Sequence, residues 1–112
     1  MIKSGTIKLP LDDPLSGMTS STSATWSLGA GTGPRSYVSP DIQFVPVGAV
    51  SPFTSPPAVV VSLAGIEATG GLARVRVSAE NVQAEEFNIR VEVFEDCTLN
   101  ALWATWVAYD AV

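Results

Sequence analysis

The sequence contains no histidine and only one cysteine, Cys97. Histidine is the commonest general base and metal ligand, and zinc sites built on cysteine need several thiolates. A metal centre would depend on carboxylates alone, so we expect neither a metal nor a cofactor. A lone cysteine cannot form an internal disulfide, and we interpret Cys97 as a buried apolar residue.

Basic charge and long apolar runs are also scarce. Six lysines and arginines stand against eleven acidic residues, which gives a net charge of -5. This balance argues against nucleic acid and anionic lipid as partners. No apolar run approaches the roughly 20 residues of a membrane span, so membrane insertion is not expected. No signal peptide is evident after Met1, and the location, secreted or cytoplasmic, stays open.

Motifs of catalysis and nucleotide binding are missing as well. The alternating glycines of residues 29–33 lack the preceding strand and the following helix of a dinucleotide site. The acidic pairs at residues 85–86 and 95–96 are sequence neighbours, which face opposite sides of a strand rather than each other. We therefore predict that the protein is not an enzyme.

The sequence does contain several short strand patterns. Residues 58–63 form a valine-rich run typical of a buried strand. Residues 72–79 and 87–93 alternate between apolar and polar side chains, as half-buried antiparallel strands do. Residues 102–109 are apolar on both faces, which predicts cover by a second sheet or by a neighbouring subunit.

Weaker signals cover the rest of the chain. We expect an edge strand at residues 6–9, irregular structure around Trp26 in residues 15–33, a strand at 42–47 broken by Pro46, a proline-rich loop at 51–57 and a turn at Gly70–Gly71. No segment has helical periodicity and no internal repeat occurs. Six or seven strands over residues 1–112 predict a single all-β domain, an antiparallel β-sandwich.

The alternation also assigns faces to the two clearest strands. The residues expected to face the core are Val75, Val77, Ala79, Phe87, Ile89, Val91 and Val93. Those expected to face outward are Arg74, Arg76, Ser78, Asn88, Arg90, Glu92 and Phe94.

Four segments of the second half carry a family resemblance. They are residues 53–63 (FTSPPAVVVSL), the arginine-bearing strand ending at residues 78–82 (SAENV), residues 87–91 (FNIRV) and residues 104–109 (ATWVAY). In order and spacing they resemble the H-type lectin domain, the family of a snail agglutinin and of the C-terminal domain of the discoidins. The first half aligns only loosely.

The resemblance implies a six-stranded antiparallel β-sandwich that assembles as a homotrimer. It further implies binding of galactose-type glycans, particularly N-acetylgalactosamine, without a metal. Three sites on one rigid body would cross-link glycans on a cell surface, which is the action of an agglutinin and supports cell adhesion.

The resemblance also implies a set of ligand-binding residues. Arg74 matches a family arginine that donates hydrogen bonds to sugar hydroxyls, and the alternation independently faces it outward. Phe94 takes the place of a stacking tryptophan, Glu95 that of a histidine or asparagine, and Asn100 that of a polar or aromatic residue. In the loop where the family carries an acidic residue, the nearest counterpart is Arg35.

The departures at Phe94 and Glu95 leave two other functions open. The trimeric β-sandwich could be structural, without a sugar site, or it could use its outward arginines and glutamates to bind another protein. In those cases Phe94 would be covered by a loop or a subunit, and Arg74 would be a solvated surface residue.

Overall fold

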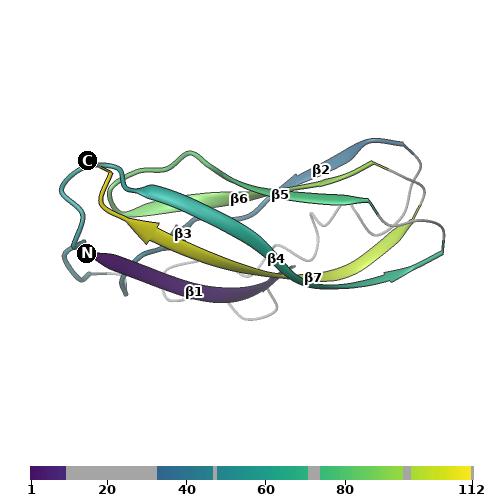
Figure 1. Cartoon of the computed structure of the whole chain (residues 1–112), viewed down its shortest axis with the longest axis horizontal. Coiled ribbons are helices and arrows are strands. Elements are labelled where there is room, and N and C mark those ends of the chain that lie inside the picture. The colour runs from purple at the N-terminus through teal and green to yellow at the C-terminus, as the bar shows by residue number, and fades with distance from the viewer. Residues whose placement is uncertain (10–32, 47, 71–73, 95–96, 112) are drawn as a thin grey trace.

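In the part of the chain that the structure describes, seven antiparallel strands pair into two sheets that pack face to face (Figure 1). The computed structural model describes residues 1–9, 33–46, 48–70, 74–94 and 97–111, and these residues contain no helix. The predicted all-β antiparallel sandwich is therefore confirmed. The strands are β1 (Ile2–Leu9), β2 (Arg35–Val38), β3 (Ile42–Gln43), β4 (Ala58–Thr69), β5 (Val75–Glu80), β6 (Glu86–Val93) and β7 (Thr98–Tyr109).

The first sheet has three strands in the order β1-β7-β4. Its central strand β7 buries alternate side chains against the second sheet, as a strand with one face on the core does. These buried residues are Leu102, Ala104, Trp106 and Ala108. The two chain ends meet on this sheet, where the ammonium of Met1 lies 2.6 Å from Asp110 Oδ2.

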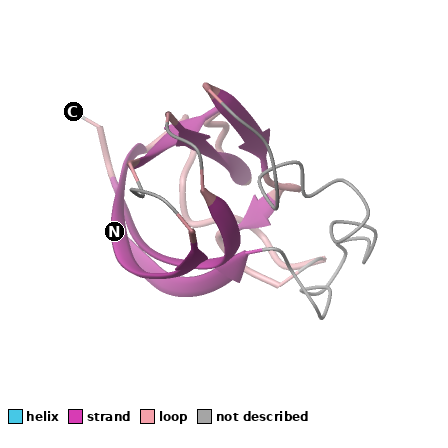
Figure 2. Ribbon diagram, turned by 90° about the vertical axis from the view of Figure 1, so that its right-hand side faces the viewer, coloured by secondary structure: helices cyan, strands magenta, loops and turns pink. Residues whose placement is uncertain are grey.

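The second sheet is centred on β6, with β5 on one side and β2 and β3 on the other. Phe87, Ile89, Val91 and Val93 of β6 have no exposed surface, as the alternation predicts. The inward residues of β5 pack against the same core from its edge. In end view the strands curve around this core (Figure 2).

Strands β2 and β3 are two pieces of one sheet edge, interrupted around Pro40. The register on β6 shifts by one residue between the pairs Val38–Arg90 and Ile42–Phe87, so the ladder breaks there. The Ser39 hydroxyl repairs it by accepting the Ile89 N–H at 2.9 Å, while Ser39 N donates to Ile89 O at 2.8 Å. This division makes seven strands where the resemblance implies six.

Other expectations from the sequence need correction. Residues 35–38 form a strand where a loop was expected, and the strand expected at 42–47 is limited to Ile42–Gln43. Asn88 points outward by parity yet is buried, because the segment after β2 covers it and accepts hydrogen bonds from its Nδ2 at Ser39 O (3.0 Å) and Asp41 Oδ1 (2.9 Å). Trp26, most of residues 15–33 and Gly71 lie outside the described residues.

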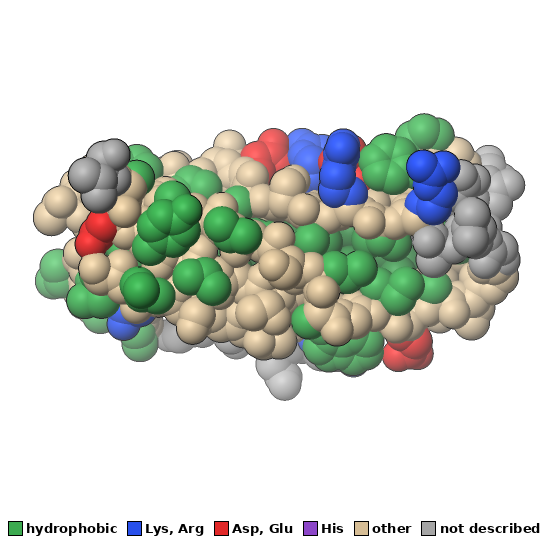
Figure 3. Space-filling view, viewed as in Figure 1, with side chains coloured by type: hydrophobic (Ala, Val, Ile, Leu, Met, Phe, Trp, Pro, Cys, Tyr) green, Lys and Arg blue, Asp and Glu red, His purple; other side chains and the backbone are tan. Residues whose placement is uncertain are grey.

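The valine-rich run is not a buried strand. It lies in β4, which is an edge strand with only β7 beside it, so its side chains reach solvent on both faces. The outward face of the end of β7 is uncovered as well. Together these strands expose an apolar surface whose five large residues are 37 to 52 % exposed (Figure 3). We call it the β4–β7 apolar surface: Val60, Leu63, Ile66, Val107 and Tyr109. Val60, Val107 and Tyr109 lie on the outward face of the sheet, and Leu63 and Ile66 lie on the inward face of β4.

Four aromatic rings fill the core near the chain ends. The Phe44 ring is 5.1 Å from that of Phe53, 5.5 Å from Phe87 and 5.8 Å from Trp106, between centroids. Phe53 belongs to the proline-rich loop, which forms no strand, as expected. Gly5 of β1 lies opposite Trp106 and leaves the space that the indole occupies.

Cys97 is buried, as predicted, and is a free thiol. We expect Cys97→Ser to lower the free energy of unfolding by about 1 kcal/mol, because a hydroxyl is harder to bury than a thiol but nearly fills its space. Urea denaturation measures the change. Loss of assembly in this variant, or an intermolecular disulfide in the native protein, would contradict this reading.

Candidate functional site

Arg74 and Phe94 lie side by side on the outward face of the second sheet. Arg74 immediately precedes β5 and Phe94 immediately follows β6, and the two strands are in register through the pair Val75 and Val93. The backbone N–H of Phe94 donates to Arg74 O at 3.0 Å. Since Val75 and Val93 face the core, the residues next to them face outward.

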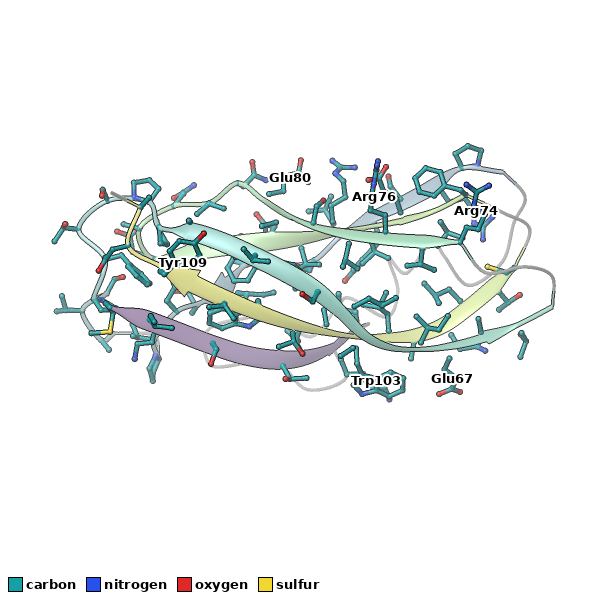
Figure 4. The ribbon with its side chains drawn as sticks, in the orientation of Figure 1. Glu67, Arg74, Arg76, Glu80, Trp103 and Tyr109 are labelled. Carbon is teal, nitrogen blue, oxygen red and sulfur yellow. The ribbon has the colours of Figure 1, made fainter. Side chains whose placement is uncertain are left out.

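Arg76 completes this group, although the sequence assigned it no role beyond facing outward. Its guanidinium carbon lies 5.4 Å from the centroid of the Phe94 ring, within the range of a cation–π contact. Glu92 holds the guanidinium there by accepting from Nε at 3.2 Å and from Nη2 at 3.1 Å. Figure 4 labels Arg76 on β5 and Arg74 just before the strand begins. We call Arg74, Arg76 and Phe94 the arginine–phenylalanine group.

A second ion pair lies further along the same face. The guanidinium of Arg90 donates to both carboxylate oxygens of Glu80, at 2.8 Å and 3.0 Å. Hydrogen bonding from Arg90 lowers the pKa of Glu80, and the same bonds raise the pKa of Arg90. These charges pair with each other across the strands, so a ligand would have to compete with Glu80 for Arg90.

Two carboxyls meet at the opposite end of this sheet. A hydrogen bond between Asp41 and Glu86 raises the pKa of Glu86 and lowers the pKa of Asp41. Asn88 lowers the Asp41 pKa further by donating to its carboxylate at 2.9 Å. When the two carboxyls share one proton, Glu86 therefore holds it in preference to Asp41.

The raised pKa of Glu86 makes the stability of the folded chain depend on pH. A folded-state pKa above the unfolded value stabilises fully below the unfolded pKa, and this stabilisation is lost as the pH rises through the folded pKa. A glutamine can donate to Asp41 at any pH, so Glu86→Gln should remove this loss. We expect a difference below about 1 kcal/mol, because both groups are largely solvated.

Urea denaturation of both proteins, from the ordinary pKa of glutamate up to neutral pH, measures this difference. The wild-type protein should lose stability relative to Glu86→Gln as the pH rises. Parallel curves for the two proteins would show that the hydrogen bond to Asp41 is not made.

The other predicted site residues do not join the arginine–phenylalanine group. Arg35 faces the core side, where it donates from Nη2 to Cys97 O at 2.7 Å and from Nη1 to Gly33 O at 3.1 Å. Asn100 is exposed but lies on β7, in the other sheet. Glu95 lies outside the described residues.

Among the described residues, no group of three or more acidic or cysteine side chains gathers to hold a metal ion. Those residues also include no helix long and apolar enough to cross a membrane.

Comparison with known proteins places this geometry in context. The sequence model of the H-type lectin domain family matches residues 50–109, more than half of the chain. Recombinant discoidin II of Dictyostelium discoideum has a similar structure, with a TM-score of 0.70 and 21% identity over 96% of this chain and 36% of that one. Wild-type discoidin II gives the same TM-score and identity over 96% and 35%.

The likeness to discoidin II shows the fold, and the chain spans about a third of the length of that protein. No curated protein sequence matches the chain. The aligned segment contains β4 to β7, and therefore the strands that carry Arg74 and Phe94.

Proposed function

The chain belongs to the H-type lectin domain family, and on this premise we propose that it binds galactose-type glycans, including N-acetylgalactosamine, at Arg74 and Phe94 without catalysis. The observation that supports the proposal is the adjacency of these two side chains on one outward surface. An arginine beside a half-exposed aromatic ring offers the two things that a sugar needs, hydrogen bonds for its hydroxyls and an apolar surface for its C–H face.

Each residue then has a distinct role. Arg74 donates a fork of hydrogen bonds to neighbouring hydroxyls, and the charge of the donor strengthens them. Phe94 supports the apolar face of the sugar. Arg76, fixed over the ring by Glu92, limits where the sugar can stack and adds a second donor. Glu95 follows Phe94 in the sequence and would accept hydrogen bonds from the ligand.

Arg35 and Asn100 have different roles in the proposed site. Arg35 ties the start of β2 to Cys97 O and so supports the site from the core side. Asn100 is on a different sheet from Phe94 in the same chain, and in this proposal it completes the polar ring from a neighbouring copy. The proposed site is therefore built across a subunit boundary.

The β4–β7 apolar surface supports assembly of three copies. Val60, Val107 and Tyr109 expose large apolar side chains on the outward face of one sheet, as is typical of a surface that a partner covers. A closed threefold arrangement would bury them around the axis and would bring separate chains next to each other. Sedimentation equilibrium at micromolar concentration should give a homotrimer, and a monomer there would refute this part of the proposal.

Calorimetric titration with N-acetylgalactosamine, galactose, glucose and mannose tests the sugar site. We expect binding of the first two and weaker or no binding of the others. One observation favours the rival function, a structural trimer without a sugar site: the Arg76 guanidinium already covers part of the Phe94 ring. Failure of every glycan on a broad array to bind the assembled protein would support that rival.

A further inference from the structure

The outward face of the three-stranded sheet changes from apolar to polar along the length of its strands. Paired residues on β1, β7 and β4 form rows across this face, and successive rows are two residues apart on β1 and β7. On β4 a register shift after Leu63 adds one residue between two of the rows. The two rows nearest the chain ends carry most of the apolar side chains. The next row holds three hydroxyls, Thr6, Thr105 and Ser62, and the row after it holds Lys8, Trp103 and Gly65.

Trp103 is the large aromatic residue of this polar part of the face. Its indole is half-buried and is not one of the residues that form the core cluster. On one side the neighbouring residue is Gly65, where an added Cβ would lie 3.6 Å from Trp103 Cε3, so the indole leans over a position without a side chain. Lys8 Nζ lies over the ring, 5.6 Å from its centroid, so the ammonium covers part of one face of the indole.

Hydrogen-bond donors and acceptors lie on the same face of the sheet as this ring. The hydroxyls of Thr6 and Thr105 are 3.5 Å apart and belong to the adjacent row. Lys8 supplies a cationic donor, and the carboxylate of Glu67 supplies acceptors. Figure 4 shows Trp103 and Glu67 projecting from the same side of the sheet. One charge of each sign and a row of hydroxyls fit a neutral ligand rich in hydroxyl groups.

We propose that Trp103, Lys8, Glu67 and the Thr6–Thr105–Ser62 row form a second carbohydrate site, for a neutral disaccharide unit. One sugar ring stacks on the indole, with Lys8 and Glu67 on its hydroxyls, and the next ring lies over the hydroxyl row, about 7 Å further along β7. The site lies on the opposite sheet from the arginine–phenylalanine group. One chain would then bind glycans on both of its outer faces.

This site does not depend on the proposed function of Arg74 and Phe94, because it shares no residue with them. It also differs from the β4–β7 apolar surface, which has no carboxylate, ammonium or aliphatic hydroxyl group among its five residues. A rival occupant of the Trp103 surface is a second copy of the chain. The test therefore measures both glycan binding and assembly.

The experiment is an NMR titration of the assembled, nitrogen-15-labelled protein with lactose and with cellobiose. The indole N–H signal of Trp103, identified by its loss in Trp103→Phe, should shift saturably with at least one disaccharide. The shift should persist in Arg74→Ala. In Trp103→Ala, the backbone amide of Thr105 should report at least about tenfold weaker binding, and Trp103→Phe should weaken it less.

Three outcomes would overturn the second site. They are an unmoved Trp103 signal at tens of millimolar of either disaccharide, a shift that disappears in Arg74→Ala, and a smaller assembly for Trp103→Ala in sedimentation. The amide of Phe94 reports the other site in the same spectra, so failure of one site is distinguishable from failure of the other. Trp103→Phe serves as the test variant if Trp103→Ala does not fold.

Discussion

Replacing Gly5 by alanine should lower the free energy of unfolding by about 2 kcal/mol, although it adds a single methyl group. An ideal Cβ at this position would lie 2.8 Å from Trp106 Nε1 and 3.0 Å from two carbons of the same ring. The indole cannot easily move away, because it is buried and packs edge-on against Phe87 and Phe44, at centroid distances of 5.3 Å and 5.8 Å. The strand or the ring cluster must shift instead.

Gly65 provides a matched control for this substitution. It is also a strand glycine opposite a tryptophan in the same sheet, but an added Cβ would make only ordinary contact, at 3.6 Å from Trp103. Gly65→Ala should therefore leave the stability unchanged or raise it slightly, since alanine restricts the unfolded chain. Urea denaturation of both variants measures the contrast. Equal losses of stability in the two variants would show that the close approach of Trp106 to Gly5 does not cause the loss in Gly5→Ala.

Arg74→Ala should weaken binding of N-acetylgalactosamine by about ten- to a hundredfold, which corresponds to roughly 1 to 3 kcal/mol. The substitution removes the charged donor fork from the site. The sugar can bind only through hydrogen bonds to its hydroxyls and through its apolar face, so the loss of this fork is large. Arg74 is exposed and precedes β5, so the fold should be retained. Arg74→Lys keeps the charge but loses the planar fork, and we expect an intermediate affinity.

Arg90→Ala is the control for a general effect of charge on this face. Arg90 lies on the same outward surface but is paired with Glu80, two ladder rows away from Phe94. We expect calorimetric titration of Arg90→Ala to give the wild-type affinity. If Arg74→Ala binds as well as wild type, or if both variants lose affinity equally, the assignment of the site to Arg74 and Phe94 is wrong.

The sequence predicted the second sheet well because its central strands have a clear period of two. Parity alone placed Phe87 and Val91 in the core and Arg74 and Phe94 on the outer face. It failed for β4, since a run of valines has the same composition in a central strand as at an exposed edge. Strand β2 was missed because four residues carry little pattern, and its pairing with β6 is set by the tertiary fold.

The candidate site was predictable only in part for similar reasons. The adjacency of Arg74 and Phe94 needs the register of β5 on β6, which strand patterns alone do not give. Arg76 was assigned only an outward face, since its contact with Phe94 depends on the side-chain conformation that Glu92 fixes. Arg35 and Asn100 required the topology, because the sheet and face of each strand decide which residues can meet.

The pairing of Ile2 with Tyr109 has a further consequence for how the domain can be joined to other proteins. The two ends leave the sandwich together (Figure 1), whereas Arg74 lies at the far end of its long axis (Figure 4). A host protein could therefore carry the domain as an insertion in one of its loops, with little change in the spacing of that loop. Fused in this way, the domain would hold the arginine–phenylalanine group at the end that points away from its host.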